Sequence, residues 1–106
     1  MKKFIVRQGD VLLFSVEKPE ISKEIPKDNG KTILAYGEVT GHSHALHGAH
    51  TYLYEHAKKA GEKILRVEKE TELIHEEHSK IKIPVGNYVV RIQKEYSPEA
   101  LRDVRD

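Results

Sequence analysis

The sequence contains no cysteine and has only one methionine, four prolines and seven glycines among its 106 residues. The absence of cysteine excludes disulfides, thiolate catalysis and cysteine-ligated zinc sites. No apolar run approaches the roughly 20 residues that a membrane helix needs, and the apolar stretch near the N-terminus is too short for a signal peptide. We therefore expect a soluble, cytoplasmic protein with no membrane partner.

The length predicts a single domain over residues 1–106 with one modest core. Lys and Arg number 18 against 17 Asp and Glu, a net charge of +1, and this balance argues against nucleic acid as a partner. A basic and aromatic stripe for RNA would consist only of Arg7, Arg91, Lys94 and Tyr96. The charged residues are mainly Lys and Glu, while Asn, Gln and Met are scarce, which is typical of thermophiles.

Short apolar runs separated by turn signals predict an all-β fold, a small antiparallel barrel or sandwich. We expect the segments 63–68 and 71–75 to form a hairpin, and both faces of the strand around Val11–Phe14 to be buried. The predicted strands cover residues 4–7, 11–16, 32–39, 51–54, 63–68, 71–75, 81–85 and 87–94.

Two further segments carry signals other than strand. Residues 17–31 contain Pro19, Pro26 and the pair Asn29-Gly30, which predicts a long loop that ends in a tight turn. Near the C-terminus, Ser97 is a good helix cap, and the Pro and Glu that follow it suit the first helical turn. We therefore expect a short C-terminal helix over residues 98–104.

Five of the seven histidines lie between residues 42 and 56, and the other two are His75 and His78. His42 and His44 alternate, so an extended backbone directs both imidazoles to one face. A turn after His75 would bring His78 beside it. We therefore predict a divalent transition metal on His42, His44, His75 and His78, or on three of these with a carboxylate. Such a site suits Zn, Ni, Fe or Cu.

The number of ligands decides what this site would do. Four protein ligands are typical of a structural or storage site, whereas three with an open position allow the metal to activate water. In the second case we expect metal-assisted hydrolysis of a small-molecule substrate, with Glu76 or Glu77 as the base. The i, i+3 spacing of His75 and His78 on a strand-like segment argues against a metalloprotease helix, which needs i, i+4.

Other interpretations of the histidines stay open. His47, His50 and His56 match ordinary surface residues, and a histidine pair acting without metal on a phosphodiester would need basic neighbours that the sequence lacks. The chain also fits a non-catalytic interaction or regulatory module, derived from a phage, whose histidines are structural or contact a partner. A homodimer is compatible with a small β-domain that has an exposed edge.

Both histidine segments belong to a set of motifs spread over nearly the whole chain. The motifs are Gln8-Gly9-Asp10-Val11-Leu12, the segment 34–44 with Gly41-His42-Ser43-His44, His75-Glu76-Glu77-His78, Ile83-Pro84-Val85-Gly86-Asn87-Tyr88 and Glu95-Tyr96-Ser97-Pro98-Glu99. Together they resemble a family of small uncharacterised proteins of bacteria, archaea and their phages. The resemblance implies that both histidine segments and the Pro-x-Gly-x-Tyr turn are family features, but it implies no activity. Cupins, which bind a metal on a β-barrel with a His-x-His segment, are a distant analogy, because the cupin Glu is absent here.

Overall fold

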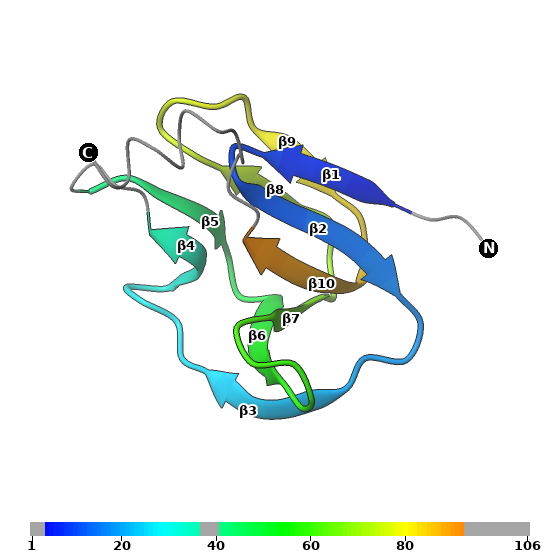
Figure 1. Ribbon diagram of the computed structural model, residues 1–106. Coiled ribbons are helices and arrows are strands. Elements are labelled where there is room, and N and C mark those ends of the chain that lie inside the picture. The colour runs from blue at the N-terminus through cyan, green and yellow to red at the C-terminus, as the bar shows by residue number, and fades with distance from the viewer. Residues whose placement is uncertain (1–3, 37–40, 93–106) are drawn as a thin grey trace, which may run out of the picture.

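The computed structural model describes residues 4–36 and 41–92, and these residues form ten β-strands in two antiparallel sheets (Figure 1). The larger sheet has the strand order β1-β2-β10-β7-β6-β3, and the smaller one has the order β4-β5-β8-β9. The strands are β1 (Ile5–Gln8), β2 (Val11–Val16), β3 (Ile21–Ile25), β4 (Lys31–Tyr36), β5 (Ser43–His47), β6 (Thr51–His56), β7 (Lys63–Val67), β8 (Thr71–Ile74), β9 (Ile81–Ile83) and β10 (Gly86–Ile92).

The predicted all-β class is confirmed, but the described strands form two open sheets and no closed barrel. The barrel alternative is therefore wrong, and the two-sheet alternative is the closer one. The helix predicted over residues 98–104 lies outside the described residues. Within 4–36 and 41–92 there is no helix that could cross a lipid bilayer.

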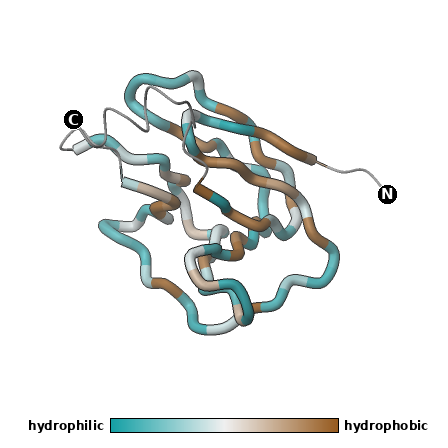
Figure 2. Tube along the Cα trace, in the orientation of Figure 1, coloured by the Kyte–Doolittle hydropathy of each residue, from teal (hydrophilic) through white to brown (hydrophobic). Residues whose placement is uncertain are grey.

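The two sheets share one core. Side chains from both sheets are buried in a single cluster, and Figure 2 shows hydrophobic residues gathered on the strands with hydrophilic connections between them. A buried pair of hydroxyls, Thr32 of β4 and Thr51 of β6, also joins the sheets, with 2.8 Å between the oxygens. The fully buried members of the core include Val11, Leu13, Leu34, Leu46, Leu65, Val67, Leu73, Ile83 and Val90.

Three details of the strand prediction are wrong, and β5 is not among the predicted strands. Residues 17–31 are not all loop, because Ile21–Ile25 pairs with β6 as an edge strand whose central residues are polar and exposed. The predicted hairpin does not form, because β7 pairs with β6 and β10 whereas β8 pairs with β5 and β9. Alternation along a strand fixes which face is buried but does not choose the partner strand.

The third error concerns β2. Its inward residues Val11 and Leu13 are fully buried, but Leu12 and Phe14 are only partly buried on the outer face. The guanidinium of Arg91 lies over the Phe14 ring at 4.9 Å, so a charged side chain covers this face instead of a second layer of core.

The Pro-x-Gly-x-Tyr segment forms the turn between β9 and β10. The Tyr88 ring is 2% exposed, and its hydroxyl donates a hydrogen bond to the carbonyl oxygen of Pro84 at 2.6 Å. Burial raises the pKa of this hydroxyl, so the group stays protonated and able to donate. The turn thereby fixes the start of β10, the strand between β2 and β7 in the larger sheet.

The shared core makes a direct prediction about stability. Replacing Leu46, fully buried in β5, with alanine is expected to lower the free energy of unfolding by about 2–5 kcal/mol, because it leaves a cavity between the sheets. The control Ile5→Ala removes the same number of carbons from a side chain that is 62% exposed, and less than about 1 kcal/mol is expected. Chemical denaturation measures both, and equal losses would contradict a core shared by the two sheets.

Candidate metal centre

The register of β5 and β8 brings the two histidine segments together. Leu46 pairs with Leu73 and Ala45 pairs with Ile74, so one further antiparallel step sets His44 opposite His75. Their ring centroids are 4.3 Å apart. His42 alternates with His44 and also meets His75, with 5.7 Å between ring centroids.

The turn after β8 adds His78 to the same cluster. Its ring centroid lies 4.7 Å from that of His75 and 5.8 Å from that of His44. His44 is 4% exposed, His42 and His75 are partly buried, and His78 is exposed. All four histidines that the sequence analysis singled out therefore lie in one cluster, which extends from the core to the surface.

One set of three side chains within the described residues offers ligand atoms that all lie within 4.8 Å of one another, namely His42, His75 and Glu76. The backbone N–H of Ser43 donates to Oε1 of Glu76 at 3.0 Å, and this hydrogen bond lowers the pKa of the Glu76 carboxyl. Glu76 is therefore a carboxylate near neutral pH. The tightest group thus contains two of the four predicted histidines and one of the two predicted glutamates.

The second glutamate has a different position. Oε2 of Glu77 lies 3.5 Å from Nδ1 of His42, and the Glu77 side chain is 65% exposed. The backbone N–H of Glu77 donates to Nδ1 of His75 at 3.0 Å. The free electron pair of the neutral His75 ring is therefore at Nδ1 in this conformation.

The buried amide of Gln8, in β1, fixes the protonation pattern of His44. Its Nε2 donates to the carbonyl oxygens of Leu73 at 3.1 Å and Ser79 at 2.9 Å. Since both N–H groups face acceptors, Oε1 is the atom that faces Nδ1 of His44, at 2.9 Å. His44 therefore carries its proton on Nδ1 and has an electron pair on Nε2. Burial lowers the pKa of His44, which keeps the ring neutral.

The turn between β1 and β2 closes the cluster from the larger sheet. Gly9 has a φ of +60°, and a Cβ there would lie 2.8 Å from Nε2 of His78 and 3.1 Å from Cε1 of His44. Asp10 follows, with Oδ1 3.7 Å from Nε2 of His44. In Figure 1 this turn and the loop between β8 and β9 lie at the same edge of the molecule.

Sequence reasoning missed the contributions of Gln8, Gly9 and Asp10 to the cluster, since their pattern indicated only a turn between two strands. One signal could have identified Gln8. It shares the inward parity of Val6 on β1, and a polar residue at an inward position needs buried partners.

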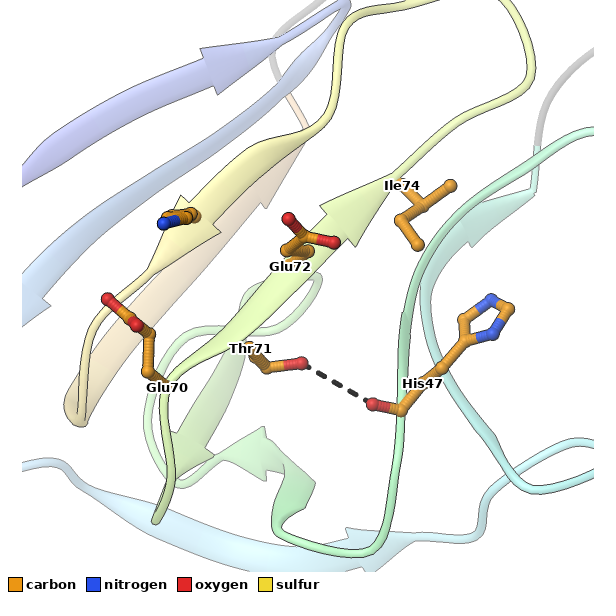
Figure 3. Close-up of a pocket in the computed structure, with 6 residues that line it drawn as sticks. His47, Glu70, Thr71, Glu72 and Ile74 are labelled. Atoms are coloured by element: carbon orange, nitrogen blue, oxygen red, sulfur yellow. Dashed lines mark hydrogen bonds between the residues drawn. The ribbon is translucent and has the colours of Figure 1, made fainter.

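The other three histidines lie outside the cluster. Nδ1 of His56 accepts the backbone N–H groups of Lys58 and Lys59, so this ring caps a turn. His50 is exposed. His47 lies on the outer face of β5 and lines an open groove of about 360 Å³ with Glu72 and Ile74 (Figure 3).

Comparison with known proteins places the chain in a family but supplies no activity. Residues 7–93 match the family described as a domain of unknown function, DUF8820, and the chain belongs to this family. No curated protein and no solved structure matches the chain. The function must therefore be argued from the cluster itself.

The role of Gln8 is testable in the metal-free protein. Gln8→Leu leaves two carbonyl oxygens and the Nδ1–H of His44 without their partner, so the free energy of unfolding should fall by about 2–4 kcal/mol. The control Ser15→Ala removes one hydrogen bond, from the Phe4 N–H at the other end of the same hairpin, and about 1 kcal/mol is expected. Chemical denaturation compares the two, and a loss no larger for Gln8→Leu would rule out the bridging role.

Proposed function

We propose that this protein binds a divalent transition metal ion through the histidine cluster, with His42, His75 and Glu76 as the first ligands. The observation that carries the proposal is the group of three ligand atoms within 4.8 Å of one another, contributed by two segments far apart in the chain. Neutral imidazole and ionised carboxylate are the forms that bind metal. The hydrogen bond from the Ser43 N–H lowers the pKa of the Glu76 carboxyl, which keeps it in the form that binds metal.

The spacing of the rings supports the same proposal. Two imidazoles on one tetrahedral ion have ring centroids about 5 Å apart, since the metal–nitrogen bond is about 2.1 Å and the centroid lies about 1.1 Å behind the nitrogen. The four measured separations in the cluster run from 4.3 to 5.8 Å. Small side-chain movements would therefore suffice to bring nitrogens onto an ion.

Two contacts would hold the ligands in place. The carboxylate of Glu77 beside Nδ1 of His42 favours a proton on that nitrogen and leaves Nε2 to the metal. The Nδ1 of His75 now accepts the Glu77 N–H, so ligation through this atom exchanges the hydrogen bond for a metal bond. Two imidazoles and one carboxylate suit Zn, Ni and Fe, which are the ions to compare.

Metal-assisted hydrolysis is the activity that we propose for this centre. Three protein ligands leave a position at which the ion can lower the pKa of a bound water. A cavity of about 280 Å³ adjoins the cluster, lined in part by His42, Ser43 and Tyr36, and it offers room for a small molecule. Glu77, largely exposed and outside the group of three, is the candidate general base.

Metal binding is tested by calorimetric titration of Zn into stripped protein that carries no histidine tag. The wild type should bind Zn and gain thermal stability that a chelator removes, because the ion binds the native state preferentially. His42→Ala and Glu76→Gln should each weaken binding by more than about 100-fold. His50→Ala, at an exposed histidine outside the cluster, is the control. Absence of Zn binding and of any thermal shift would favour the interaction module instead.

Hydrolysis is tested with Zn-loaded protein and p-nitrophenyl acetate. At saturating Zn, Glu77→Gln should lower kcat by about 10²–10⁴-fold, the usual contribution of a general base. Glu55→Gln, an exposed glutamate of β6, should leave kcat unchanged. Turnover no faster than Zn in buffer, or equal in both variants, would contradict the hydrolytic proposal and leave metal binding in place.

A further inference from the structure

Two further potential ligand atoms, one from Asp10 and one from His44, lie close together on the core side of the cluster. Oδ1 of Asp10 and Nε2 of His44 are 3.7 Å apart. Because Oε1 of Gln8 accepts a hydrogen bond from the Nδ1–H of His44, the neutral ring has no hydrogen on Nε2. The Asp10 carboxylate oxygen and Nε2 of His44 are therefore two potential ligand atoms 3.7 Å apart.

The Asp10 side chain is 40% exposed, so water can solvate this pair in the absence of metal. A cation in place of that water would bind both atoms. Two ligand atoms on one ion lie about 3.0–3.4 Å apart when each bond is about 2.1 Å, so the observed 3.7 Å is only a few tenths of an ångström too wide.

His78 is the histidine that approaches this pair from the loop after β8, although its ligand atom must move closer to share an ion, since the described residues hold only one group of three within 4.8 Å, that of His42, His75 and Glu76. Nε2 of His78 lies 2.8 Å from the point where a Cβ on Gly9 would stand, and Cε1 of His44 lies 3.1 Å from that point. Both rings therefore approach the backbone between Gln8 and Asp10 from the same side. The missing side chain of Gly9 is what leaves them this room.

We propose that Asp10, His44 and His78 hold a second divalent first-row cation beside the one on His42, His75 and Glu76. The inference rests on the proposed function and extends it to a two-metal centre. His75, a ligand in the first group, also contacts the second, since its ring centroid lies 4.3 Å from that of His44 and 5.7 Å from that of His42. Paired ions of this kind can stabilise both the attacking and the leaving oxygen of a hydrolysed ester.

The test counts Zn per chain by calorimetric titration and by elemental analysis after desalting. Wild type should bind two ions, Asp10→Asn one, Glu76→Gln one, and the double variant none. Glu24→Gln, which removes a carboxylate from the exposed middle of the edge strand β3, away from the cluster, should still bind two. Thermal unfolding of each stripped variant controls for folding.

Nitrogen NMR of His44 gives a second, independent measurement. In the metal-free wild type at neutral pH, we expect the His44 ring to carry its proton on Nδ1 and none on Nε2. We expect the same tautomer in Asp10→Asn. The Nε2 resonance should shift when the second equivalent of Zn is added to the wild type. An Nε2 resonance of His44 that does not respond to the second equivalent of Zn would overturn the inference.

The stoichiometry separates this inference from the proposed function. One Zn in both the wild type and Asp10→Asn would eliminate the second ion and leave the first. One Zn in the wild type and none in Asp10→Asn would mean a single ion that uses Asp10, which also overturns the second site. No Zn in the wild type would remove both proposals.

Discussion

The side-chain amide of Gln8 is the contact on which the histidine cluster depends. It lies in the β1–β2 hairpin of the larger sheet, yet all three of its hydrogen bonds go to the smaller sheet, at His44 of β5, Leu73 of β8 and Ser79 in the loop between β8 and β9. One residue thereby ties the sheets together at the end where the cluster lies. The same amide determines which nitrogen of His44 has a free electron pair. One side chain therefore both connects the sheets and sets the tautomer of a histidine in the cluster.

Backbone topology explains why the cluster forms at this end. The chain leaves β7 in one sheet and enters β8 in the other, and β8 then pairs with β5. This crossing sets His75 opposite His44, whereas a β7–β8 hairpin would have kept the two histidine segments apart. The apolar pairs Leu46–Leu73 and Ala45–Ile74 hold that register, because a slip of one residue would turn Leu46 and Leu73 out of the core.

The sequence was informative where a property is local and silent where it depends on partners. Alternating apolar residues located most strands, and the His42-x-His44 spacing implied two rings on one face, as both their contacts with His75 bear out. The edge strand Ile21–Ile25 was not predicted, because its middle residues are polar and it is stabilised by pairing with β6. The partners of Gln8 and Asp10 could not be found either, because they lie across the molecule, although the inward parity of Gln8 on β1 indicates that it needs buried partners.

The gradient of burial through the cluster has a consequence for how a bound metal would act. His44 is part of the core, whereas Glu76 and Glu77 are exposed at the loop after β8. An ion on the buried side would be linked to folding, because its ligands are held together only in the native state. An ion on the exposed side would exchange more readily and would have water within reach. The buried side of the cluster would then contribute to folding stability and the exposed side to reactivity, and the Gln8 amide holds His44 on the buried side.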